Sequence, residues 1–468
     1  MLFSSITFLY AFLPALLILY FVVPPRGRNG VLLAASLLFY AWGEPVYLFL
    51  MLGSILAGYG FGLLIDRFRH KPRTANLLTA VSICVSLSSL VLFKYSDFFL
   101  STVNALTGSS FALLGLALPV GISFYTFQIL SYTIDVRRGD APVQRNPFTF
   151  ATYVALFPQL IAGPIVRYVT VADELEHRTT GRTDIAYGVG RFTVGLGKKV
   201  LLANVLGELC EIYRETTDGS VLFTWLYAVS YALHLYFDFS GYSDMAIGLG
   251  RIFGFHFLEN FNYPYISRSI TEFWRRWHMS LGTWFRDYVY IPLGGNRVSR
   301  LRWVFNLAVV WMLTGFWHGA GWTFILWGLW FGVWLICEKL FLGAWLKKLP
   351  TAVSWIWTTL LVLLGFVLFD AESLTAALSR MGNLFGGGGL PLVSDTALYY
   401  LRSYAVVLII AVIGATPLPR LAWQKIRASL PGETVSTVLE PLALGGLLLL
   451  VSAYLIDGSY NPFIYFRF

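Results

Sequence analysis

The dominant pattern in the 468-residue chain is a succession of long apolar runs, separated by short segments that carry most of the basic residues. About 20 apolar residues cross a bilayer as a helix, and runs of roughly this length recur. The apolar pattern predicts about twelve membrane spans. They are expected near residues 5–23, 31–42, 45–66, 75–96, 111–133, 184–206, 221–245, 302–316, 321–343, 351–369, 399–416 and 438–456.

Two further segments do not fit simple spans. Residues 147–166 are apolar but contain Pro147, Pro158, Gly163 and Pro164, and basic clusters flank both ends, which favours a re-entrant segment. Residues 251–301 are rich in aromatic and basic side chains, which is typical of amphipathic helices in the cytoplasmic interface. The run 5–23 lacks the basic start of a secretory signal, so we expect a retained helix with its N-terminus outside.

The basic residues test this topology. With the N-terminus outside, 26 of the 34 Lys and Arg residues fall on the cytoplasmic side and five fall outside or near it. The last three, Arg191, Lys198 and Lys199, fall inside the span 184–206. Either that span begins later, or these side chains face a polar cavity. The asymmetry accounts for the net charge of +9 without a nucleic-acid partner.

The composition supports a membrane protein. Hydrophobic residues make up 57% of the chain and charged residues 13%, whereas a soluble domain carries about 25% charged residues. No polar stretch is long enough for a separate soluble domain, so we expect one integral membrane domain over residues 1–468. The three cysteines, Cys84, Cys210 and Cys337, lie in apolar segments and form no pattern typical of disulfides or metal binding.

Two of the six histidines are the strongest candidates for chemistry. His278 follows the sequence WRRW, and His318 follows Phe316 and Trp317 and precedes Gly319. An ionisable group at bilayer depth costs several kcal/mol and therefore marks a site by default. A neutral imidazole, with an ordinary pKa near 6.5, suits a general base for acyl transfer. The alternative is a histidine that only hydrogen-bonds a neighbouring helix.

The segment 271–287 around His278 holds side chains that can bind a phosphate or carboxylate. Its arginines can grip an anionic donor such as coenzyme A, or they can simply be positive-inside anchors. The candidates for donor binding or tunnel lining, here and elsewhere, are Arg275, Arg276, Trp277, Arg286, Asp287, Asp238, Ser240, Asp244, Gln128 and Trp317.

Asp238 and Asp244 are carboxylates in an apolar stretch, six residues apart. They can orient a histidine or pair with an arginine, and a purely structural buried ion pair is the alternative. No carboxylate–histidine spacing resembles a zinc site, so we expect no metal. The chain also lacks GxSxG, Walker A and HExxH sequences, which argues against a serine hydrolase, a P-loop ATPase and a zinc protease.

Four stretches carry a family resemblance: residues 157–165 (FPQLIAGPI), 236–248, 260–295 and 313–328. In this order they resemble the membrane-bound O-acyltransferase (MBOAT) family, and within it the bacterial branch that acetylates polysaccharides such as alginate. The resemblance runs from the initial MLFSS to residues 461–466. By this resemblance, His318 corresponds to the catalytic histidine of the family and His278 to its second signature residue.

The resemblance implies an all-α polytopic membrane protein. A ring of about 11–12 transmembrane helices, with re-entrant and interfacial helices, would surround a central tunnel. It implies acetyl-CoA as the acyl-donor substrate, with no permanently bound cofactor, and an extracellular or periplasmic polysaccharide as the acceptor. It also implies a bacterial inner-membrane location and a periplasmic acetyltransferase or lipoprotein partner within a polysaccharide synthesis complex.

Other readings remain open at this point. Within the family, the acceptor can instead be teichoic acid that receives D-alanine, peptidoglycan or a lipid. From other classes, the chain can be a polymer or solute channel gated by the histidines, or a scaffold for a synthase. The absence of internal sequence repeats and of an ATP-binding motif weighs against the channel.

Overall fold

The regular elements of the protein are helical throughout the described residues of the computed structural model, which confirms the all-α prediction. The structure describes residues 1–161, 163–429, 431, 435–458 and 461. Ala162 and residues 462–466, which belong to stretches that carry the family resemblance, lie outside this part. The contact pattern divides the chain into two compact units, which we describe separately. The prediction of a single domain over residues 1–468 stays a prediction.

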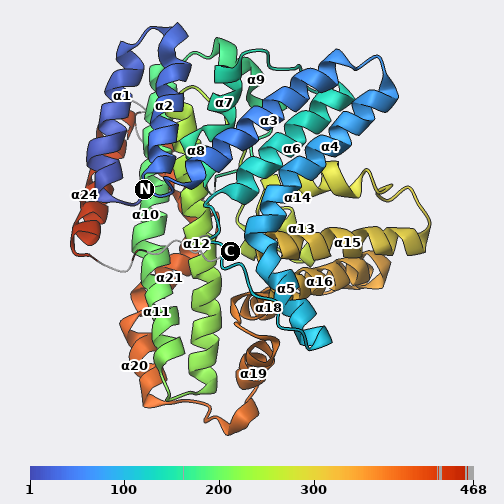
Figure 1. The fold of residues 1–468 in the computed structure, drawn as a ribbon. Coiled ribbons are helices and arrows are strands. Elements are labelled where there is room, and N and C mark those ends of the chain that lie inside the picture. Colours follow the sequence, from blue (N-terminus) through green and yellow to red (C-terminus); the bar gives the residue numbers. More distant parts are fainter. Residues whose placement is uncertain (162, 430, 432–434, 459–460, 462–468) are drawn as a thin grey trace. The chain divides into compact units, whose positions relative to one another are not determined.

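Unit 1 comprises Met1–Phe192 and Ser243–Leu258. Its helices are drawn in blue to green in Figure 1, and turns of other helical types join some of them. They are α1 (Leu13–Val22), α2 (Arg28–Ala41), α3 (Tyr47–Arg67), α4 (Pro72–Leu90), α5 (Ser96–Thr107), α6 (Ile122–Arg138), α7 (Pro147–Ala155), α8 (Phe157–Leu160), α9 (Tyr168–His177) and most of α10 (Arg182–Gly197).

The core of unit 1 contains the broken segment that the sequence analysis singled out. Asn146 begins α7 because its side chain accepts hydrogen bonds from the N–H groups of Phe148 and Thr149. The helix stops at Leu156, and the short helix α8 that follows is buried throughout. Phe157 packs there against Phe39, with 5.4 Å between ring centres. Re-entrance of residues 147–166 into a membrane stays a prediction.

One predicted span is wrong at its N-terminal end. Residues 111–118, which begin the expected span 111–133, lie outside any helix, and α6 begins only at Ile122. Pro119 lacks a backbone N–H and disfavours helix in the residue before it. Gly121 then adopts a left-handed backbone, with φ of 77°, immediately before the helix. Apolar composition alone does not reveal such a break.

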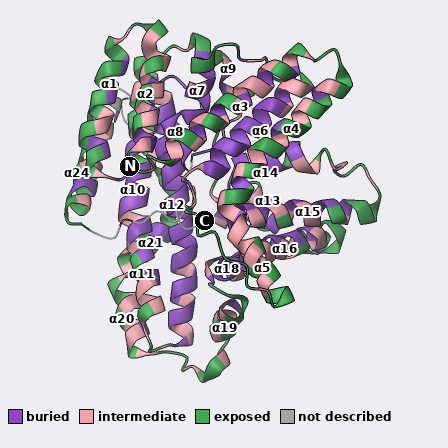
Figure 2. Ribbon diagram, viewed as in Figure 1, coloured by how far each residue is buried: buried purple, intermediate pink, exposed green. Residues whose placement is uncertain are grey.

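Unit 2 comprises Thr193–Tyr242 and Glu259–Phe468. It contains the first two-thirds of α12, a long helix that is buried along most of its length (Figure 2). The part of α12 (Val221–Ile252) up to Tyr242 belongs to unit 2, and the remainder belongs to unit 1. The other helices of unit 2 are α11 (Asn204–Glu215), α13 (Ile270–Trp274), α14 (Met279–Phe285), α15 (Arg300–His318), α16 (Trp322–Cys337), α17 (Gly343–Leu346), α18 (Thr351–Asp370), α19 (Leu374–Leu384), α20 (Asp395–Ser403), α21 (Ala405–Gly414), α22 (Leu418–Ser429) and α24 (Glu440–Ile456).

Helices α15 and α16 form a tightly packed hairpin in unit 2. A Cβ atom on Gly315 would lie 2.1 Å from the carbonyl oxygen of Phe324, and one on Gly328 would lie 2.1 Å from that of Trp311. Only glycine permits this approach of two helix backbones. The hairpin fixes the end of α15, where His318 lies.

Several helices are long and apolar enough to cross a membrane, as an integral membrane protein requires. In the described part these are Tyr47–Arg67, Pro72–Thr107, Trp322–Leu346, Thr351–Asp370 and Thr437–Ile456, and the bent pair Asp395–Ser403 and Ala405–Gly414 forms a sixth if it is one span. They coincide with six of the predicted spans. The other predicted spans fall on helices that are shorter or more polar, so the full count and the central tunnel stay predictions.

We predict that Gly328→Ala lowers the thermal stability of the protein. Overpacking of this kind costs about 1–3 kcal/mol because two backbones must separate. Gly53→Ala is the matched control, since nothing lies within 4 Å of a Cβ atom on this helical glycine. Melting of the detergent-solubilised protein, followed by size-exclusion chromatography, measures both. An equal Tm for Gly328→Ala and the parent would contradict the packing described above.

Candidate active site

The two candidate histidines lie in unit 2, each at the end of a helix. His318 is the last residue of α15, and three residues separate it from α16. His278 immediately precedes α14. The side chains are nearly inaccessible, with 2% exposure for His278 and 6% for His318. Their ring centres are 6.5 Å apart, so the structure brings the two imidazoles together.

Aromatic side chains enclose both imidazoles. Trp317 lies 4.9 Å from His318 and 6.0 Å from His278, measured between ring centres. Trp327 and Phe369 lie 5.0 and 5.5 Å from His318. The ring of Phe239, from α12, lies 4.6 Å from His278. The two rings therefore lie in a low-dielectric environment, and at His278 burial disfavours the charged imidazole.

His278 has a left-handed backbone, with φ of 44°, which is uncommon for a residue other than glycine. Contacts with Asn260 hold His278 in this backbone conformation. The side-chain Oδ1 of Asn260 lies 3.1 Å from His278 Nδ1 and accepts hydrogen bonds from the N–H and Oγ–H of Ser280. The backbone carbonyl of Asn260 accepts from the N–H of Met279. Such strain costs about 1–3 kcal/mol and persists where neighbouring contacts over-determine it, commonly at functional sites.

His278 lies outside the helices that are long enough to span a membrane. Burial lowers the pKa of its imidazole to about 3, so the ring is neutral near pH 7. Its Nε2 atom is buried and has no hydrogen-bond partner among the described residues. A neutral imidazole with one uncommitted nitrogen can accept a proton or a hydrogen bond from a bound molecule.

Glu338 anchors the chain that leads to His278. It follows α16, is 7% exposed, and accepts hydrogen bonds from the N–H groups of Ile270 and Thr271 at the start of α13, at 2.6 and 2.8 Å. Ser269 caps the same helix by accepting from the N–H of Glu272. The segments that carry the two histidines are thus tied to one another through Glu338.

Asn260 and Glu338 were not among the candidates predicted from the sequence. Glu338 did carry a signal, because a carboxylate at the end of an apolar run needs a partner. Asn260 carried none, because its role depends on a chain reversal that brings residue 260 against residue 278.

The two candidate aspartates are buried and form ion pairs, as their structural alternative supposed. Asp238 pairs with Lys199 in unit 2, and Asp244 pairs with Arg191 in unit 1, both with 2.6 Å between charged atoms. Arg191 and Lys199 are two of the basic residues that the topology left within a predicted span. Lys199 lies in a π-helical turn, Lys198–Ala203, a distortion often found where a side chain has a special task.

The remaining candidates are dispersed. Arg276 bonds to Glu272, one turn earlier, and Arg286 bonds to its neighbour Asp287 with 57% of its side chain exposed. Arg275 is also exposed, whereas Trp277 is buried against Phe261 and Phe273. The hydroxyl of Ser240, buried in α12, has no partner in the described part of the chain. Gln128 is buried in α6 of unit 1, and the ring of Trp317 lies close to those of both histidines.

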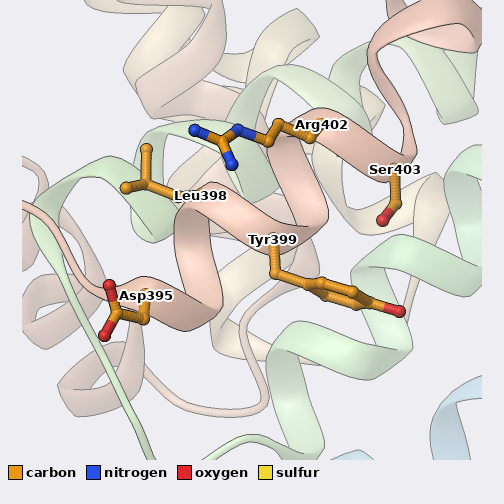
Figure 3. A pocket seen from close by; sticks show the side chains of 5 residues that line it. All are labelled: Asp395, Leu398, Tyr399, Arg402 and Ser403. Atoms are coloured by element: carbon orange, nitrogen blue, oxygen red, sulfur yellow. The ribbon is translucent and has the colours of Figure 1, made fainter.

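An open hollow also lies on α20, lined by Asp395, Leu398, Tyr399, Arg402 and Ser403 (Figure 3). All five side chains come from one helix, and the hollow contains neither histidine.

We predict that Lys199→Met is strongly destabilising, because it leaves the Asp238 carboxylate buried without its cation. Removing one partner of a buried pair costs about 3–5 kcal/mol. The double variant Lys199→Met/Asp238→Leu should recover part of the loss, since it removes both charges. Tm values of the single and double variants measure this coupling. Equal losses in the two would show that the pair is not the stabilising contact.

Comparison with known proteins agrees with the sequence resemblance. Residues 80–371 match the model of the MBOAT, membrane-bound O-acyltransferase, family. The probable alginate O-acetylase AlgI of Azotobacter vinelandii is 41% identical over 500 residues, covering 100% of both chains. The protein of the same name from Pseudomonas aeruginosa is 45% identical over 395 residues, 83% of this chain and 75% of its own.

A relative with a different acceptor is also similar. The peptidoglycan O-acetyltransferase of Helicobacter pylori is 36% identical over 428 residues, covering 84% of this chain and 81% of its own. The match to the family model and the full-length match to a relative show the family directly, in agreement with the histidine pair and the apolar helices. The chain belongs to the membrane-bound O-acyltransferase family and is an acyltransferase embedded in a membrane.

Proposed function

We propose that this enzyme transfers acetyl groups from cytoplasmic acetyl-CoA, across the membrane, towards hydroxyl groups of an alginate-like exopolysaccharide. His318 and His278 are the reacting pair in this proposal. The observation that carries it is the pair itself: two buried imidazoles, 6.5 Å apart, inside an aromatic enclosure of a membrane acyltransferase. The relatives that match over most of this chain are named for alginate acetylation, which supports the acceptor.

The chemistry needs one group that takes a proton and later releases it. The oxygen of an acceptor hydroxyl group, on the polymer or on the periplasmic partner that completes the transfer, attacks the acetyl carbonyl carbon as its proton passes to an imidazole nitrogen. The carbon–sulfur bond then breaks, and the proton passes to the thiolate of coenzyme A. The products are the O-acetyl ester and free coenzyme A, with no net release of protons. Exclusion of water by the surrounding aromatic rings protects the thioester from hydrolysis.

The membrane setting explains why such a site would lie within a bilayer. Acetyl-CoA is made in the cytoplasm and is too highly charged to cross, whereas the polymer is outside. The arrangement proposed here has an N-terminus outside, in a bacterial inner membrane. A periplasmic acetyltransferase or lipoprotein of the polysaccharide synthesis complex would complete the transfer.

We predict that His318→Ala and His278→Ala each reduce acetyl transfer by about 10²–10⁴-fold, the contribution of a positioned acid–base group. His70→Ala is the control, because His70 is exposed in unit 1 and belongs to no site described here. Purified variants are compared for release of free coenzyme A from acetyl-CoA, in the presence of deacetylated alginate and the periplasmic partner. Full activity in both site variants would overturn the assignment of the pair.

The acceptor is tested in the same assay. Deacetylated alginate, peptidoglycan fragments and teichoic acid are offered in parallel, and radiolabel from acetyl-CoA is followed into each. Label in alginate alone supports the proposed acceptor. Label in peptidoglycan alone would replace that acceptor while leaving the acetyl-transfer chemistry intact.

A further inference from the structure

The contacts of Asn260 determine which nitrogen of His278 carries the proton. The backbone N–H of Ser280 can only donate, and it lies 3.2 Å from the side-chain atom of Asn260 that also faces His278. That atom must therefore be the amide oxygen, Oδ1. The hydroxyl of Ser280 lies 2.9 Å from the same atom, which is consistent with a second donor.

An amide oxygen can only accept hydrogen bonds. Because Nδ1 of His278 lies 3.1 Å from Oδ1, this nitrogen must carry a hydrogen and donate it. A bare Nδ1 would set two lone pairs against each other at that distance. The Ser280 hydroxyl is also 3.5 Å from Nδ1, but it already donates over a shorter distance to Asn260.

The protonation state of the other ring nitrogen, Nε2, follows by elimination. Burial keeps the His278 ring neutral, as described above, and a neutral imidazole carries one hydrogen. With that hydrogen on Nδ1, Nε2 presents a lone pair. Nε2 is the atom that has no partner within the described part of the chain, on a ring that faces Phe239, Trp317 and His318. None of these three neighbours carries a fixed charge.

We infer that Asn260 is a positioning residue that locks His278 in its Nδ1–H tautomer and so makes Nε2 the proton-accepting nitrogen of the acyl-transfer pair. This inference rests on the proposed function and assigns the proton transfer within it. The acceptor oxygen bonds to the acetyl carbon while its proton moves to Nε2. The carbon–sulfur bond then breaks, and the proton leaves Nε2 for the thiolate sulfur.

The backbone supports the same conclusion. Asn260 is fully buried, and its carbonyl oxygen accepts from Met279 N–H while Asn262 N–H donates to the carbonyl of Arg276. These bonds hold the left-handed turn at His278 against its cost in strain. A side chain needed only for packing would not have to satisfy a histidine nitrogen and a serine at once.

The tautomer can be read directly in the resting protein. The chain has six histidines, so selective ¹⁵N-histidine labelling gives few signals, and the spectrum of His278→Gln identifies those of His278. We expect a protonated Nδ1 and a bare Nε2 in the parent and in Asn260→Asp, which keeps an acceptor oxygen. We expect the tautomer to change or become mixed in Asn260→Leu. A protonated Nε2 in the parent would overturn the inference.

Steady-state kinetics test whether acetyl transfer requires this tautomer of His278. Asn260→Leu should lower kcat for acetyl transfer by about 10²–10⁴-fold with little change in KM for acetyl-CoA, since the proton acceptor is lost while the donor site is not. Asn260→Asp should restore most of the activity. Asn296→Leu, at an exposed asparagine of unit 2 outside the site described above, is the control and should keep the parent kcat.

A failure of the inference about Asn260 can be distinguished from a failure of the proposed function. If the parent protein transfers acetyl groups but Asn260→Leu keeps both tautomer and kcat, the inference fails and the proposed function stands. If no acetyl transfer occurs in any protein but Asn260→Leu shifts the tautomer, the positioning role stands and the reaction is a different one. If Asn260→Leu does not fold, Asn260→Asp and the parent spectrum still decide the tautomer.

Discussion

The structure depends on one constraint: a charge or polar group placed among apolar side chains must find its partner within the protein. The two carboxylates of α12 meet this constraint through Lys199 and Arg191, and Glu338 meets it by accepting two backbone N–H groups. Each of these contacts joins segments that are far apart in the chain. Such contacts give the packing a specific register that apolar surfaces alone do not.

The same constraint explains why imidazoles occupy the candidate site. Arginine would remain charged there and need a counter-ion, whereas histidine can enter an aromatic enclosure in its neutral form. Its two nitrogens can then be treated differently. One is held by Asn260, and the other is buried without a hydrogen-bond partner in the described part of the chain. The burial, the tautomer and the backbone strain of His278 thus all result from its packing against Asn260 and the surrounding aromatic rings.

The sequence alone predicted part of the fold and part of the candidate site. The helical class, six of the spans and the choice of His278 and His318 as candidates followed from apolar runs and from the residues that carry the family resemblance. The break at Pro119 and Gly121 was missed because residues 111–118 are as apolar as a true span. The partners of Asp238 and Asp244 were visible as unplaced basic residues, but which would pair with which required three-dimensional contacts. Asn260 gave no signal, since an amide is informative only once its neighbours are known.

Unit 1 is discontinuous in the chain, because Ser243–Leu258 returns to it after the first part of unit 2 has begun. The ion pair between Arg191 and Asp244 spans 53 residues and closes this return. Membrane proteins are synthesised from the N-terminus, and segments fold as they emerge. Arg191 therefore leaves the ribosome well before the carboxylate that neutralises it. The ion pair that closes unit 1 can therefore form only after the last part of α12 has been synthesised.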